Sequence, residues 1–296
     1  MPLVDTVGIN SCNKTFFMSF AFMSSETDPD YMWATQCNLE LYTLHVSSVE
    51  PSIIATNAEP ALIGAVHKVF PKAQALLCQW HIQKNVAKHC KGGFATDEAW
   101  QAFENAFNAV FYAKTKQEYE DQLQQFSIKY AFNKHPWFED DYVKYIKSTW
   151  LTHKTQCVQA WTDQYLHFGT TVTSRIEGAH AVIKQFLHSS TGDLLSTWQN
   201  IEMAVMDQFI RICSNAATLH SKIPLGVKRT IYSQLYGLVT IPAFRLVEKH
   251  CWNIMSIPLR PCTGMFTTTM GLPCIYRYNQ AHKLSTSLTI EDFHPQ

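Results

Sequence analysis

The spacing of hydrophobic and polar positions in the first ninety residues predicts a mixed α/β fold. Residues 3–9 and 15–23 are rich in β-branched and aromatic residues and flank a turn-like Asn-Ser-Cys-Asn segment, so they predict a β-hairpin. Residues 52–56 and 75–77 have the composition of short buried strands. Helical periodicity and capping residues predict three helices, at 27 to about 44, 59–69 and 79–91.

The pattern becomes helical and aromatic-rich over residues 96–150, without a strand signal. A further helix is predicted to open at Ile176, and Asp193 is expected to cap a long helix that reaches about Ala217. Residues 255–278 are expected to form short strands around Gly264 and Gly271. The chain therefore divides into four parts, which are an α/β front (1–92), a helical insertion (93–165), a return to the front (166–220) and a C-terminal region (221–296).

Composition excludes several classes of protein. The 296 residues are 46% hydrophobic and only 16% charged, against about 25% in an average domain, which excludes a disordered chain, a coiled coil and a polycationic nucleic-acid binder. No stretch reaches the roughly 18 apolar residues of a membrane span, and no secretory signal is recognisable, so no membrane partner is expected. The nine cysteines are an odd number spread along the chain, which favours a reducing compartment.

Charge is unevenly distributed although the net charge is zero. Residues 1–70 carry two basic and seven acidic side chains, whereas residues 151–296 carry twelve basic and eight acidic ones. An acidic front suits a divalent metal ion and a basic back suits a phosphate backbone. Ordinary surface variation explains the same counts, and from charge alone it is the favoured explanation.

Three motifs follow one another in a fixed order, namely TNAEPAL at residues 56–62, LLCQWHI at 76–82 and TSRIEGAH at 173–180. Flanking stretches agree with them, including KTFFMSFAFMSSE at 14–26 and AWTDQYLHF at 160–168. Together they resemble the Mutator-like (MULE) transposases over roughly residues 1–195. The tail PCTGMFTTTMGLPCIY at 261–276 resembles the C-terminal region of some members of that family.

The resemblance implies an RNase H-like α/β fold, in which a mixed sheet with flanking helices is interrupted by a helical insertion. It also implies a DDE active site, whose three carboxylates hold two Mg²⁺ or Mn²⁺ ions for phosphoryl transfer on DNA. In the family the first strand lies in the middle of the sheet and carries the first Asp. Residue 1 of this sequence falls within the second strand, so the first, central strand is expected to be missing.

The three carboxylate positions can be compared one by one with this sequence. Glu177 occupies the third position, while Asn57 stands at the second position, where the family has Asp. Asp5 matches the second strand, where the family has no catalytic residue, and it is interpreted as an ordinary strand residue. Glu59 is interpreted as an acid at a helix start. With one carboxylate of three, we expect an inactive, truncated and degenerate copy that does not bind Mg²⁺ or Mn²⁺ tightly.

Three functions follow from the resemblance. The first is a transposase-derived protein that has lost DNA cleavage and strand transfer. The second is a domesticated DNA-binding transcriptional regulator, and the third is an active transposase represented by an incomplete gene. Each implies DNA as partner, with transposon terminal inverted repeats as the family's target, and residence in the nucleus; a homo-oligomer is also considered.

Two Cys-containing motifs permit both a metal-binding and a structural interpretation. Cys78 and His81 have metal-like spacing and match a Cys/His pair of the family, but a buried thiol and a packed imidazole explain them equally well. Cys262 and Cys274 match a SWIM-like zinc finger in which two of four ligands are replaced, by Gly264 and Tyr276. We therefore expect no tight zinc site there.

The helix that carries Glu177 also presents basic side chains. Lys184, His180 and His188 fall on its face with Glu177, and Arg175 lies just before them. Arg175 and Lys184 are therefore candidate contacts to DNA phosphates. A solvated helix face explains each of these residues taken singly.

Overall fold

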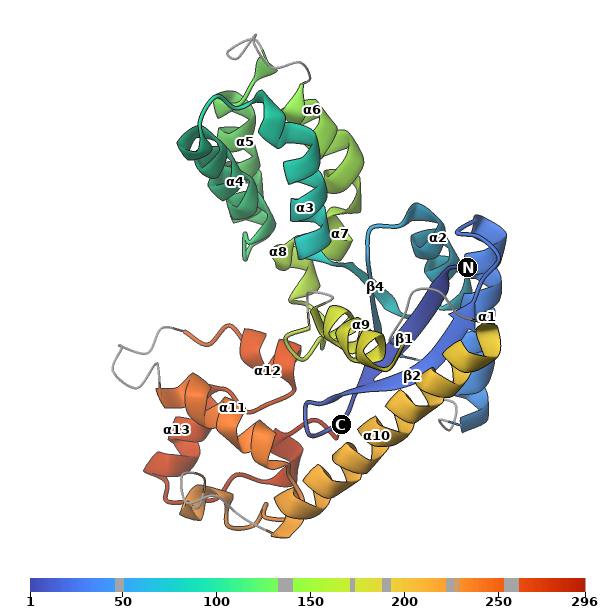
Figure 1. Cartoon of the computed structure of the whole chain (residues 1–296). Helices are drawn as coiled ribbons and strands as arrows, with labels where there is room; N and C mark the ends of the chain where they lie inside the picture. The colour runs from blue at the N-terminus through green and yellow to red at the C-terminus, as the bar shows by residue number, and fades with distance from the viewer. Residues whose placement is uncertain are drawn as a thin grey trace. The chain divides into compact units, whose positions relative to one another are not determined.

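The computed structural model describes residues 1–45, 51–132, 141–170, 174–187, 193–221, 227, 229–252 and 261–295. These residues form an α/β structure and divide into two compact units (Figure 1). Unit 1 comprises Met1–Phe22 and Ser174–Gln296, and unit 2 comprises Met23–Thr173. None of the helices in the described ranges combines the length and hydropathy needed to cross a membrane.

Unit 1 begins with the β-hairpin that the sequence predicts. Strand β1 (Leu3–Ile9) pairs antiparallel with β2 (Thr15–Phe22), with a shift in register after Thr6. The Asn10 side-chain oxygen accepts hydrogen bonds from the backbone N–H groups of Cys12 and Lys14, which closes the turn as an Asn in this place commonly does.

Two helices pack on the hairpin, as Figure 1 shows for α9 (Ser174–Leu187) and α10 (Leu194–Ser221). Phe17 of β2 shares a small buried cluster with Ala179, Ile183 and Ile201. As predicted, Asp193 begins α10, because its side chain accepts the Ser196 N–H at 2.9 Å.

The C-terminal region is helical, so the strands predicted between residues 255 and 278 are wrong wherever the structure describes this range. It contains the 3₁₀ turns η6 (Thr230–Tyr232) and η7 (Ile290–Asp292) and the helices α11 (Ile241–Trp252), α12 (Met265–Met270) and α13 (Ile275–Lys283). The three threonines at 267–269 favour a strand locally. Gly264 and Gly271, at φ 70° and 64°, instead adopt the left-handed conformation that brackets α12.

This region has an apolar core of its own, around the fully buried Phe244, Tyr232 and Tyr278. Both tyrosine hydroxyls donate to one carboxylate oxygen of Glu248, at 2.9 and 3.1 Å, and Arg229 pairs with the other oxygen at 3.2 Å. This half-buried carboxylate joins three segments through charge-assisted hydrogen bonds.

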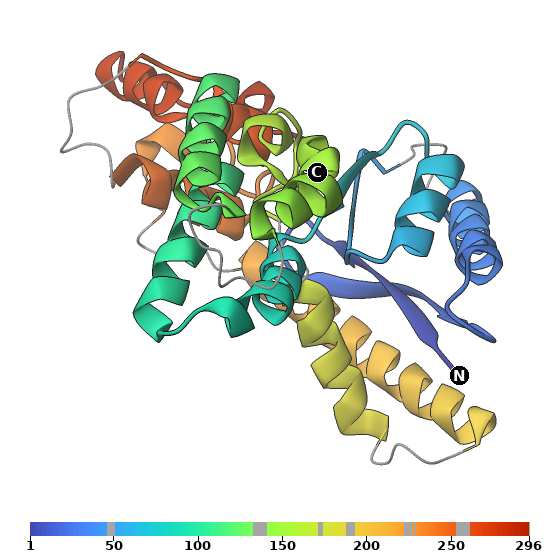
Figure 2. The ribbon, with the colours of Figure 1, turned by 90° about the horizontal axis from the view of Figure 1, so that it is seen from above.

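Unit 2 begins with α1 (Asp28–His45), β3 (Ile53–Thr56), α2 (Pro60–Val69), β4 (Gln74–Leu77) and α3 (Gln79–Cys90), in agreement with the predicted elements. Strands β3 and β4 are parallel, with α2 as the crossover between them, and α1 lies beside α2 (Figure 2). In the described residues, β1–β2 and β3–β4 are separate two-stranded sheets.

The remainder of unit 2 is helical, as predicted for the insertion. It consists of the 3₁₀ turn η1 (Lys91–Gly93), α4 (Asp97–Phe111), α5 (Lys116–Lys129), α6 (Tyr142–Tyr145), the π-helical turn η3 (Ile146–Trp150), the 3₁₀ turn η4 (Leu151–His153), α7 (Lys154–Cys157) and α8 (Gln159–Thr162). Phe103, which is fully buried, lies in its centre and contacts the rings of Trp100, Phe126 and Tyr130.

Replacing Phe103 by Ala should lower the free energy of unfolding of unit 2 by about 3–5 kcal/mol. The reason is that the closely packed aromatic side chains around it cannot move in to fill the cavity left by the ring. Urea denaturation followed by tryptophan fluorescence measures the change. Ile128→Ala is the matched control on α5, since that side chain is 54% exposed and should cost less than about 1 kcal/mol. An equal loss of unfolding free energy in the two variants would contradict the assignment of Phe103 to the centre of the core.

Candidate functional site

Asn57 lies where the parallel pair of unit 2 ends. Thr56 is the last residue of β3 and pairs with Leu77 of β4, and the Cys78 N–H donates to the Thr56 carbonyl at 3.0 Å. Asn57 and Cys78 therefore follow neighbouring strands at the same edge of the sheet, the edge at which open parallel sheets bind ligands. The Asn57 side chain is exposed at this edge.

The Cys78 and His81 pair lies at the start of α3, on the same edge. Cys78 is 1% exposed and precedes the first residue of the helix, where it packs into the core. His81 is half-buried and meets the ring of Trp80 edge-on, and the Lys84 ammonium lies 4.3 Å from the Trp80 ring centre. Cys78 thus lies in the core and His81 nearer the surface. A metal-binding role for the two residues stays a prediction.

Glu177 lies in the first turn of α9 in unit 1, and its side chain is exposed. His180 follows one turn later and Lys184 one turn after that, so the three charged side chains share one face of the helix. His188 and Thr173, which the sequence places next to this face, lie outside the described residues. Glu177 and Asn57 thus belong to different units.

Asp5 holds α9 against the hairpin, a role that the sequence interpretation as an ordinary strand residue misses. The His180 Nε2 donates to the Asp5 Oδ1 at 2.7 Å, and the Asp5 side chain is only 5% exposed. Its other oxygen, Oδ2, is buried and has no hydrogen-bond partner in the described part of the chain. Asp5 lies between Leu3 and Val7 on the strand face that packs inward, and this alternation is the signal that could have indicated a buried carboxylate.

The hydrogen bond from His180 to Asp5 is the largest influence on the imidazole and raises the pKa of His180. Desolvation and the nearby Lys184 ammonium lower the pKa of His180, while the Glu177 carboxylate raises it slightly. The imidazolium form is therefore favoured beside Glu177.

Arg175, a predicted phosphate contact, is engaged with the hairpin turn. Its Nη2 donates to the Asn13 side-chain oxygen at 2.6 Å and its Nη1 to the Asn13 carbonyl at 3.3 Å. Asn13 itself has φ 58°, the left-handed conformation that Asn tolerates best after Gly. Burial lowers the pKa of Arg175. Lys184 differs from it because its side chain is exposed.

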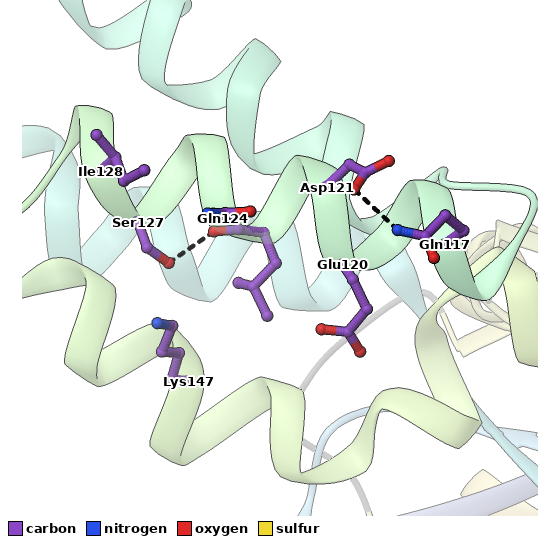
Figure 3. A pocket seen from close by; sticks show the side chains of 8 residues that line it. Gln117, Glu120, Asp121, Gln124, Ser127, Ile128 and Lys147 are labelled. Atoms are coloured by element: carbon purple, nitrogen blue, oxygen red, sulfur yellow. Dashed lines mark hydrogen bonds between the residues drawn. The ribbon is translucent and has the colours of Figure 1, made fainter.

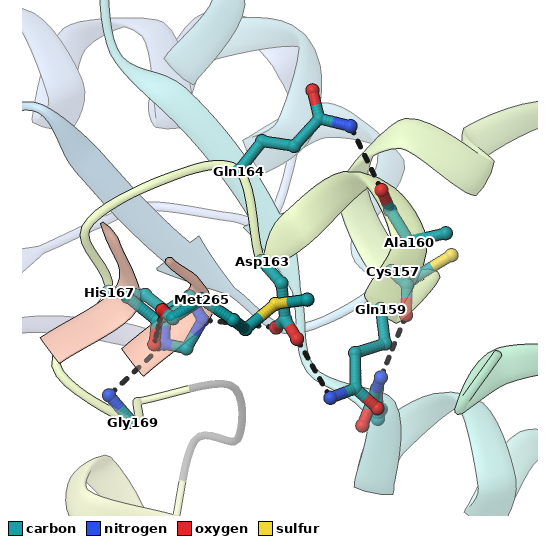
Figure 4. Close-up of polar contacts among 10 residues, drawn as sticks. Cys157, Gln159, Ala160, Asp163, Gln164, His167, Gly169 and Met265 are labelled. Atoms are coloured by element: carbon teal, nitrogen blue, oxygen red, sulfur yellow. Dashed lines mark hydrogen bonds and ion pairs between the residues drawn. The ribbon is translucent and has the colours of Figure 1, made fainter. Parts of the chain in front are cut away.

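The AWTDQYLHF stretch contains a second Asp–His pair, shown in Figure 4, and both of its side chains are buried. The Asp163 carboxylate accepts from Gln159 at 2.8 Å and from His167 Nε2 at 3.3 Å. The Gly169 N–H donates to His167 Nδ1 at 3.1 Å, which assigns the ring proton to Nε2. These bonds close the turn after α8, at Phe168 and Gly169 with positive φ, so we interpret the pair as structural.

One groove lies on the helical insertion, between α5 and η3 (Figure 3). It is open to solvent, has a volume of about 490 Å³, and is lined mainly by polar side chains such as Gln117, Glu120 and Lys147. A Gln117–Asp121 hydrogen bond of 3.0 Å and a Ser127 bond to the helix backbone satisfy part of the lining. The groove has the features of a solvated helix surface.

Asn57 supplies a neutral oxygen at the position where the resemblance implies an anionic one. In the described ranges no three His, Cys, Asp or Glu side chains are grouped to hold a metal. The Cys262 and Cys274 sulfurs lie 3.7 Å apart, and the side chains of Gly264 and Tyr276, at the other two positions of the predicted finger, are not those of the usual zinc ligands.

Replacing Asp5 by Asn should return the pKa of His180 toward its ordinary value of about 6.5, because the carboxylate is the main cause of the increase. Lys184→Gln, made in the chain that keeps Asp5, should raise the pKa of His180 further, since the Lys184 ammonium opposes protonation of the ring. The stabilisation by the pair is fully present below pH 6.5 and is lost as pH rises through the raised folded-state pKa. NMR titration of the His180 ring measures the shifts, and an unchanged pKa in Asp5→Asn would contradict the pairing.

Comparison with known proteins supports the resemblance over part of the chain. Residues 1–85 match the MULE transposase domain. Protein FAR1-RELATED SEQUENCE 5 of Arabidopsis thaliana is 23% identical over 186 residues, and FAR1-RELATED SEQUENCE 6 of the same plant is 29% identical over 106 residues. The aligned regions cover 58% and 36% of this chain, and 23% and 14% of those proteins.

A fungal protein is also similar. The PKS-NRPS hybrid synthetase cheA of Chaetomium globosum is 24% identical over 221 residues, which are 68% of this chain but 5% of that protein. The chain thus spans less than a quarter of the length of each of these three relatives. The resemblance inferred from the sequence is confirmed over residues 1–85, which match the MULE transposase domain and contain the first two of the three motifs.

Proposed function

We propose that this chain is a MULE transposase-derived, DNA-binding segment that has lost strand cleavage. The observation that carries the proposal is Asn57, an exposed neutral amide at the carboxyl end of β3, at the edge where the family places a catalytic Asp. The match of residues 1–85 to the MULE transposase domain supports this assignment of the position.

The loss of cleavage follows from the charge that two-metal catalysis requires. Two divalent ions about 3.5–4 Å apart repel each other, and anionic oxygens must offset that repulsion while leaving room for the attacking and leaving oxygens. The amide of Asn57 can touch a metal through its carbonyl oxygen but contributes no negative charge. Glu177 is then the single carboxylate that this sequence brings to the family's three positions.

The RNase H-like arrangement is part of the same proposal. Each strand pair of the described residues has the direction expected for a flanking part of that sheet, antiparallel for β1–β2 and parallel for β3–β4. A two-stranded parallel sheet is uncommon by itself, because parallel strands are normally covered on both faces and joined in larger sheets.

The chain should not nick DNA that contains terminal inverted repeats, with either Mg²⁺ or Mn²⁺, because the donor set cannot hold two ions. Asn57→Asp alone should not restore nicking, since one carboxylate is still lacking. A gel assay on supercoiled plasmid measures both. Metal-dependent nicking by the unmodified chain that Glu177→Ala abolishes would overturn the loss of cleavage.

DNA binding without cleavage is the activity that remains, and it would place the protein in the nucleus. A role as a domesticated regulator is the second candidate, favoured by the basic excess in residues 151–296. Of the two predicted phosphate contacts, Lys184 is exposed, while Arg175 is engaged with Asn13. Phosphate contact is therefore assigned first to Lys184.

Lys184→Glu should weaken DNA binding and reduce the slope of log K against log salt by about 1, because one phosphate contact is removed. Fluorescence anisotropy at several salt concentrations measures the slope. Lys283→Glu is the matched control, since it removes the same charge from an exposed position on α13. Equal weakening in both variants would show only non-specific attraction and would contradict the assignment to α9.

A further inference from the structure

The C-terminal region brings two cysteine sulfurs into contact outside the site described above. Cys262 precedes α12 and Cys274 precedes α13, and their Sγ atoms lie 3.7 Å apart. Both thiols are free, Cys262 is exposed and Cys274 is half-buried. A reagent in solution can therefore reach Cys262 first, with Cys274 directly behind it.

The surroundings of Cys262 are open on the side of Gly264. A disulfide needs an S–S distance of about 2.05 Å, so the sulfurs must approach by less than one van der Waals diameter. Gly264, two residues after Cys262, has φ 70° and open space around the position of a Cβ atom. Its N–H donates to the Cys262 sulfur at 3.4 Å, which holds that side chain on the side of Cys274.

A metal-binding explanation fits this pair less well than a thiol one. Structural zinc takes four ligands. In the described residues no third His, Cys, Asp or Glu joins the two sulfurs. The C-terminal region also has its own apolar core and the Glu248 network, in which protein side chains join its segments.

From this geometry we propose that Cys262 and Cys274 form a reversible, redox-responsive disulfide, with a low-molecular-weight disulfide such as glutathione disulfide as the oxidant. The Cys262 thiolate attacks one sulfur of glutathione disulfide and releases one glutathione thiolate. The Cys274 thiolate then displaces the second glutathione and closes the protein disulfide. The two protons and two electrons lost by the protein thiols appear in two molecules of glutathione.

The order of attack gives the proposal a distinctive chemical signature. Because the second step is intramolecular, the mixed disulfide at Cys262 is consumed as soon as it forms and does not accumulate. Without Cys274 it has no internal thiol to resolve it. In a reducing compartment the pair stays as two thiols, and it closes when the glutathione pool becomes oxidised.

The test treats the full chain with glutathione disulfide and maps the peptides by mass spectrometry. In the unmodified chain, the peptide that contains both Cys262 and Cys274 should be two hydrogens lighter than its dithiol form. Cys274→Ser should instead retain one glutathione on Cys262. Cys213→Ser is the matched control, since Cys213 is exposed on α10, and it should leave the linked peptide unchanged.

Two results would overturn the proposal. One is stable glutathione on Cys262 of the unmodified chain, which would show that Cys274 does not resolve it. The other is tight binding of one zinc ion per chain through both thiols that blocks the reaction, which would make the pair a metal site. A second readout is thermal: the linked form should melt at a higher temperature than the reduced form, and thiol reductant should reverse the shift.

Discussion

The buried carboxylate of Asp5 is the constraint on which the arrangement of unit 1 depends. A carboxylate that is 5% exposed is costly unless it is paired, and His180 of α9 supplies the partner. This contact fixes the rotation of α9 on the hairpin, with Ala179 and Ile183 facing inward. Glu177, one turn before His180, is consequently presented to solvent whether or not other carboxylates complete the site.

In unit 2, too, the backbone that positions a site residue does not depend on the charge of that residue's side chain. The parallel register of β3 and β4 places Asn57 beside the start of α3 through backbone hydrogen bonds, which do not depend on the side chain at position 57. An Asp at this position can therefore be replaced by Asn without loss of the local fold. The metal chemistry is more sensitive, because it depends on the charge of that side chain.

Local signals made much of the fold predictable from the sequence. The Asn-rich turn, the Asp193 cap and the alternating strands each act within a few residues, and the structure confirms the elements that they indicate. The helices at residues 265–283 were not predicted, because the Thr run favours a strand and the deciding influences are two left-handed glycines and a tertiary core. The Asp5–His180 and Arg175–Asn13 contacts join residues 175 and 162 positions apart, which no local pattern reports.

The central claim is our proposal that Asn57 leaves this chain without the negative charge that a two-metal site requires. Titration of the chain with Mn²⁺, followed by electron paramagnetic resonance, tests the claim most directly, because bound Mn²⁺ loses the sharp spectrum of the free aqueous ion. The account predicts that stoichiometric protein leaves the free-ion spectrum unchanged. Loss of signal equivalent to two ions per chain, reversed by Glu177→Ala, would contradict it.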